Sequence, residues 1–139
     1  MSWLRLSILL LLVPLLSAAD LADELADLTG YVILSSERID DFEGCEYGKI
    51  VQFDSRAFVT CEEYGYQYAY SADAVILVRH LGAGGRFSCK MAVEDEIYDI
   101  DCNDYVSRHI AILRSFRDKG DERMRAYADR ILQTLGVQK

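Results

Sequence analysis

Four tyrosines alternate with other residues in the middle of the chain, and their type and spacing suggest a binding chemistry. They are Tyr64, Tyr66, Tyr68 and Tyr70. Alternate side chains of an extended strand point to the same face, so all four rings should project together. Such a row could stack on sugars, peptide side chains or another flat ligand while the hydroxyls form hydrogen bonds. The row is the candidate binding surface of this chain.

A structural role explains the same row. Rings on one face of a strand can cover the hydrophobic core, or pack against rings of neighbouring strands, and leave only the hydroxyl groups in water. Of the two interpretations we favour core packing, because no obvious recognition group lies nearby in the sequence.

Only His80 and His109 could serve as acid–base catalysts near neutral pH, and neither belongs to a nucleophile motif. The glycines at 82–85 lack the Lys-Ser/Thr of a phosphate loop and predict a hairpin. We therefore predict no catalytic residue and no cofactor. A small secreted hydrolase using scattered carboxylates is the alternative, and a concave pocket that gathers His80 with carboxylates would favour it.

Metal sites are poorly supported. The cysteines lie 16, 28 and 13 residues apart, without the C-x-x-C pairs of zinc sites or redox dithiols. The acidic stretch at 99–103 spaces three oxygen ligands like the start of a calcium loop. Asp104, however, stands where that loop needs glycine, and Ile110 stands where it needs glutamate. We expect a solvated acidic loop and no metal.

The N-terminus has the three parts of a secretory signal peptide: Arg5, an apolar run at 6–16, and Ser17-Ala18-Ala19. Cleavage after Ala19 leaves residues 20–139 as one exported domain, periplasmic or secreted. The apolar run is about half the ~20 residues of a membrane-spanning helix, so no transmembrane segment is expected after cleavage.

Export also bears on the cysteines, because an even set in an oxidising compartment predicts disulfides. They are Cys45, Cys61, Cys89 and Cys102. Three pairings are open. We favour Cys45–Cys61 with Cys89–Cys102, because each pair closes a short loop around one predicted strand or turn.

Loss of the signal, whose one charged residue is Arg5, changes the net charge from −8 to −9 and argues against nucleic-acid binding. The charge is segregated: residues 20–104 hold 6 basic and 19 acidic side chains, and residues 105–139 hold 8 and 4. We expect the basic tail to pack against the acidic body. Association of the tail with a membrane surface is the alternative.

The pattern of elements predicts an α+β class that is mainly β. A short helix at 21–28 precedes a β body at about 29–102, and a helical segment interrupted by Gly120 covers about 105–136. Five to six short strands favour an antiparallel meander, curled sheet or small barrel. The strands are expected at 31–34, 49–53, 57–70, 74–81, 86–93 and 96–101, with turns at 40–44, 54–56 and 71–73.

Two segments of the β body share a cysteine–tyrosine pattern, FEGCEYGK at 42–49 and CEEYGYQYAY at 61–70. The pattern resembles that of a group of small exported bacterial proteins of unassigned function. The resemblance implies bacterial export and supports a Cys45–Cys61 bridge. It brings no catalytic residue, and Cys89 and Cys102 lie outside it. The sequence thus predicts a non-catalytic module that binds an unknown protein or envelope component.

Overall fold

The computed structural model describes residues 23, 25–82 and 85–137, and the chain separates into two units, residues 1–31 and 32–139. In the first unit, residues 23 and 25–27 are helical and residues 28–30 form a turn. The helix predicted at 21–28 is not confirmed, and the predicted signal peptide lies outside the described residues. Among the residues described, no helix is both long enough and apolar enough to span a membrane.

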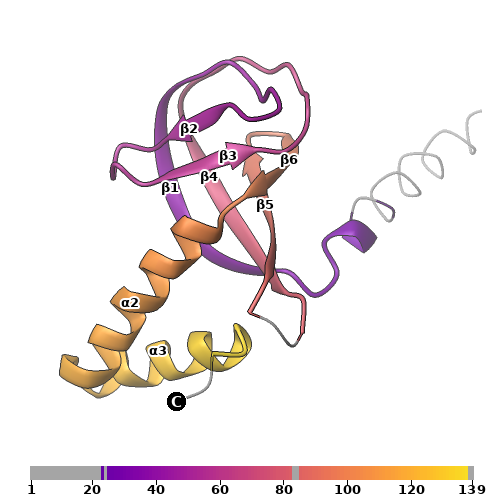
Figure 1. The fold of residues 1–139 in the computed structure, drawn as a ribbon. Coiled ribbons are helices and arrows are strands. Elements are labelled where there is room, and N and C mark those ends of the chain that lie inside the picture. Colours follow the sequence, from indigo (N-terminus) through magenta and orange to yellow (C-terminus); the bar gives the residue numbers. More distant parts are fainter. Residues whose placement is uncertain (1–22, 24, 83–84, 138–139) are drawn as a thin grey trace, which may run out of the picture. The chain divides into compact units, whose positions relative to one another are not determined.

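The second unit is a six-stranded antiparallel sheet followed by two helices (Figure 1). Its order in space is β1-β4-β5-β6-β3-β2. The predicted α+β, mainly β class is therefore confirmed, in the form of a curled half-barrel sheet. The strands and helices are β1 (Val32–Phe42), β2 (Ile50–Gln52), β3 (Phe58–Cys61), β4 (Ala69–His80), β5 (Phe87–Val93), β6 (Glu96–Asp101), α2 (Asn103–Lys119) and α3 (Glu122–Thr134).

The sheet curls far enough to bring its two edges together. β4, β5 and β6 form a meander, whereas the short β2–β3 hairpin joins the far side of β6 through β3. β1 and β2 are thus the two edge strands. The amide of Asp54, just after β2, donates a hydrogen bond to the carbonyl of Arg38 in β1 at 3.0 Å. This bond links opposite edges of the sheet, and Figure 1 shows β2 crossing in front of β1.

The hydrophobic core lies on the inner face of the curl, where alternate residues of the strands are buried, as the two-residue strand period requires. Its largest fully buried side chain, Tyr105 at the start of α2, meets the ring of Phe53 edge-on at 5.8 Å between centroids. The Tyr105 hydroxyl donates a hydrogen bond to the Glu37 carboxylate of β1 and is also in hydrogen-bond contact with Ser35. Tyr105 therefore fixes the beginning of α2 to the sheet.

Three of the predicted elements are wrong. The strand predicted at 57–70 is not continuous, because β3 ends at Cys61 and β4 begins at Ala69. The turns predicted at 40–44 and 71–73 fall largely inside β1 and β4. Those strands pair through this region, with Asp41 opposite Tyr70 and Arg38 opposite Asp73. Long-range pairing therefore overrides the local turn preference, and Ser71 stays within β4 although its φ is +50°.

The cysteines are paired as the spacing predicts. Cys45 is bridged to Cys61 with 5.5 Å between Cα atoms, and Cys89 to Cys102 with 6.1 Å. The first bridge ties the β1–β2 connection to the end of β3. The second ties β5 to the residue that precedes α2.

Candidate functional site: the tyrosine surface

The four tyrosines form an exposed surface, which we call the tyrosine surface. The exposed fractions of Tyr64, Tyr66, Tyr68 and Tyr70 are 78%, 91%, 55% and 72%. The expectation that the rings cover the core is therefore wrong. Three of them lie in the connection at 62–68 between β3 and β4, and Tyr70 lies in β4. Exposure alternates along this connection as it would in a strand, because residues 63, 65 and 67 are less exposed than the tyrosines beside them.

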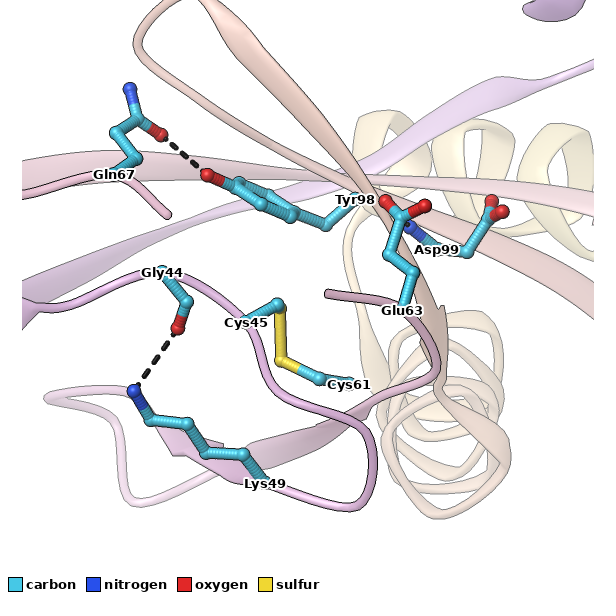
Figure 2. The surroundings of a disulfide bond; sticks show 8 residues. All are labelled: Gly44, Cys45, Lys49, Cys61, Glu63, Gln67, Tyr98 and Asp99. Carbon is cyan, nitrogen blue, oxygen red and sulfur yellow. Dashed lines mark hydrogen bonds between the residues drawn. A yellow bond between two sulfur atoms is a disulfide. The ribbon is translucent and has the colours of Figure 1, made fainter. Parts of the chain in front are cut away.

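The residues between the tyrosines hold this connection against β6. The Glu63 carboxylate accepts a hydrogen bond from the Asp99 amide at 2.7 Å. The Tyr98 hydroxyl donates to the side-chain oxygen of Gln67 at 3.0 Å, and the Gln67 amide nitrogen donates to Asp95 at 3.0 Å. Figure 2 shows Glu63 and Gln67 directed towards Asp99 and Tyr98 respectively. Glu63 is therefore directed towards β6, and Gln67 towards β6 and the turn that precedes it.

Two glycines allow the connection to lie close to its neighbours. The amide and carbonyl of Gly65 exchange hydrogen bonds with those of Cys45 at 2.9 and 2.8 Å. A Cβ at Gly65 would come within 2.5 Å of the Tyr98 ring, and one at Gly44 would come within 2.2 Å of the Gly65 carbonyl oxygen. Gly44 also has a φ of +81°, which glycine adopts without steric cost. Side chains at these positions would separate the segments.

The Cys45–Cys61 bridge closes the same region from the other side (Figure 2). The Lys49 ammonium donates to the Gly44 carbonyl at 3.0 Å. The Cys61 amide donates to the Lys49 carbonyl at 2.8 Å, and the Gly48 amide donates to the Cys61 carbonyl at 2.8 Å. The connection that carries the tyrosines is thus held by a covalent bond, backbone hydrogen bonds and side-chain hydrogen bonds together.

Carboxylates border the tyrosine surface. Partial desolvation, followed by the charge and hydrogen bond of Asp41 and the charge of Glu43, raises the pKa of Tyr68. The Tyr68 and Tyr70 rings lie 6.0 Å apart, tilted by 47°. Asp41 is also the pairing partner of Tyr70 across β1 and β4. Aromatic faces and carboxylate oxygens therefore meet at one place.

The two histidines pack on different aromatic rings and do not contact each other. The His80 ring packs on Phe87 at 5.5 Å, and its Nδ1 accepts the Gly82 amide at 3.2 Å. The His109 ring stacks on Tyr105 at 4.5 Å.

A pocket of about 310 Å³ lies beside the Cys89–Cys102 bridge. It is lined by Glu62, Phe87, Ser88, Cys89, Asp99, Ile100, Asp101 and Asn103. Neither His80 nor His109 lines this pocket.

The carboxylates of the acidic stretch at 99–103 have hydrogen-bond and ion-pair partners within the protein. Asp101 accepts the backbone and side-chain N–H groups of Asn103 at 3.0 and 2.7 Å, and Asp99 is paired with Lys90 at 2.7 Å. Within residues 23, 25–82 and 85–137, no group of three or more His, Cys, Asp or Glu side chains is placed to hold a metal ion.

Sequence reasoning missed the residues that hold the tyrosine surface in place. Glu63 and Gln67 are polar, so on a strand they predict an outward face with the tyrosines turned inward. The real orientation is the reverse, because β6 offers the polar partners Asp99 and Tyr98 to these side chains. The one local signal was Gly65, since a glycine in an extended segment often marks close approach of another chain segment.

We compared the chain with known proteins. No protein-family model, curated protein or solved structure matches this chain.

Proposed function

We propose that this chain is an exported, disulfide-bonded β domain that acts by binding, and that its tyrosine surface is the contact for a protein or envelope component. One observation carries the proposal. In the connection at 62–68 the alternate residues are anchored to β6 and to Cys45, while the tyrosine rings project outwards. An anchored backbone with exposed rings is a surface available for contact.

The physical properties of such a surface favour binding. Tyrosine offers a large apolar ring with a polar tip and few torsions to immobilise, so it is enriched at interfaces. A segment that is already held in place loses little further freedom when a partner binds, which lowers the entropic cost of association. The anchoring by Glu63, Gly65 and Gln67 has this effect on the neighbouring tyrosines.

Export rests on separate support. The signal-type N-terminus and the two disulfides are both typical of proteins that mature outside the cytoplasm. Periplasmic or secreted localisation is part of the same proposal.

Site-specific photo-crosslinking tests the binding surface while the partner is still unidentified. A photoreactive phenylalanine replaces Tyr66 in one variant and Tyr127, an exposed tyrosine of α3, in the other. We expect a discrete adduct in the producing cells from position 66 and none from position 127. Equal labelling from both positions, or no adduct from position 66, would contradict the proposal.

A further inference from the structure

The segments around the tyrosine surface carry charge of one sign. Residues 40–47 and 62–73 contain seven aspartates and glutamates and no lysine or arginine. Six of these carboxylates belong to exposed residues: Asp40, Asp41, Glu43, Glu46, Glu62 and Asp73. The nearest cations along the chain have partners within the fold, because Arg38 pairs with Asp73 at 3.1 Å and Lys49 donates to the Gly44 carbonyl. The surface therefore presents aromatic rings within a negative field.

Rings and carboxylates together favour a cation. The face of a tyrosine ring attracts an ammonium or guanidinium group through its quadrupole, and a nearby carboxylate adds a hydrogen bond and an ion pair. Tyr68, Tyr70 and Asp41 supply this combination, because the two rings lie 6.0 Å apart and Asp41 lies directly opposite Tyr70 in the β1–β4 pairing. A guanidinium over these rings would lie within reach of the Asp41 carboxylate.

We infer that the occupant of the tyrosine surface is an extended polypeptide segment that carries arginine or lysine at alternate positions. This inference deepens the proposed function and rests on it. The tyrosines lie at every second residue from 64 to 70, and in an extended chain such residues repeat at about 6.6 Å. An extended partner repeats its own alternate side chains at the same interval. Four basic side chains can thus face four rings.

The shape of the surface distinguishes a polypeptide from a small ammonium compound. Sites for small ligands bury most of the ligand, usually in a concave pocket. The tyrosine rings are instead 55–91% exposed and follow one another along the chain. An extended segment can contact every ring at once, whereas a small cation would contact one or two.

Titration of the intact, disulfide-bonded protein with peptides tests the inference. The probe is a short peptide in which arginine alternates with serine, and glutamate replaces arginine in the control peptide. Tetramethylammonium is the third probe and tests whether a small cation binds in place of a peptide. We expect saturable binding of the arginine peptide, and no saturable binding of the control peptide or of tetramethylammonium at the same concentrations.

Matched variants locate the binding. Asp41→Asn/Glu43→Gln should weaken binding of the arginine peptide by about tenfold or more, because two charge contacts are lost. Glu122→Gln/Asp129→Asn removes two exposed charges from α3 and should leave affinity nearly unchanged. Tyr70→Phe should retain binding, because the ring face remains, whereas Tyr70→Leu should weaken binding several-fold.

The outcomes separate this inference from the proposed function. If a partner crosslinks from position 66 but the arginine peptide does not bind, the surface is a binding site and the cationic partner is wrong. Equal peptide affinity in the Asp41/Glu43 and Glu122/Asp129 variants would also overturn the inference, as would tetramethylammonium binding as tightly as the peptide. Absence of both the crosslinked adduct and peptide binding would contradict the proposed function as well as this inference.

Discussion

Gly65 lies against the ring of Tyr98 so closely that a Cβ at the glycine would come within 2.5 Å of the ring carbon Cε1. Gly65→Ala should therefore lower the free energy of unfolding by about 1–3 kcal/mol, the usual cost of overpacking. Urea unfolding measures the effect.

A double-mutant cycle assigns that cost to the contact. Tyr98→Leu removes the ring that the new methyl group meets, so Gly65→Ala should cost less in the Tyr98→Leu background than in the wild-type protein. Additive costs would show that the contact between Gly65 and Tyr98 is not what requires glycine.

The two disulfides should differ in what they hold in place. Their loops span 16 and 13 residues, so removal of either bridge by paired Cys→Ala substitutions should cost about 3 kcal/mol. Only loss of Cys45–Cys61 should accelerate amide hydrogen exchange in residues 62–68, because Cys45 is hydrogen-bonded to Gly65. The Cys89→Ala/Cys102→Ala variant is the matched control. Equal acceleration in both variants would contradict this account.

Tyr105 should make stability depend on alkaline pH. Burial first, and then the hydrogen bond to Glu37, raise the pKa of Tyr105 above its ordinary value of 10.0. The neutral side chain is thus favoured by folding, and its contribution is complete below about pH 10. Above that pH the unfolded tyrosine ionises first, so stability falls by up to about 1.4 kcal/mol per pH unit until the folded pKa is reached.

Tyr105→Phe isolates this contribution. The variant loses the contacts with Ser35 and Glu37 and should be about 1–3 kcal/mol less stable at about pH 8. The deficit should shrink at about pH 11, because phenylalanine does not ionise. Tyr98, whose pKa burial also raises, is present in both proteins and cancels in the comparison. A constant deficit at the two pH values would contradict the role given to Tyr105.

The class of the fold could be predicted because its signals are local. Gly82–Gly85 and the cysteine spacing indicated the β4–β5 hairpin and the two bridges from short stretches of sequence. The extent of β1 and β4 could not be predicted in this way. Their pairing through Asp41 and Tyr70 depends on residues far apart in sequence, and it extends both strands across stretches that have the composition of turns.

The site was predicted in part. The four tyrosines were identified from their alternation, but alternation alone does not say which face of an extended segment meets the protein. That choice depends on β6, which provides hydrogen-bond partners for Glu63 and Gln67 and a ring surface for Gly65. The importance of Asp41 and Glu43 likewise depends on the pairing of β1 with β4, which brings their charges close enough to raise the pKa of Tyr68.

The stability of Tyr66→Ser/Tyr68→Ser tests most directly whether the tyrosine surface is free to bind. Because these rings are 91% and 55% exposed, the double variant should unfold within about 0.5 kcal/mol of the wild-type protein for each substitution. Tyr98→Ser, which removes a ring that is 3% exposed, should instead cost several kcal/mol, like the ~3–5 kcal/mol of other aromatic truncations in cores. Urea unfolding of the three proteins decides the matter: an unchanged midpoint for the double variant is the result we predict, and a collapse comparable to that of Tyr98→Ser would contradict the account.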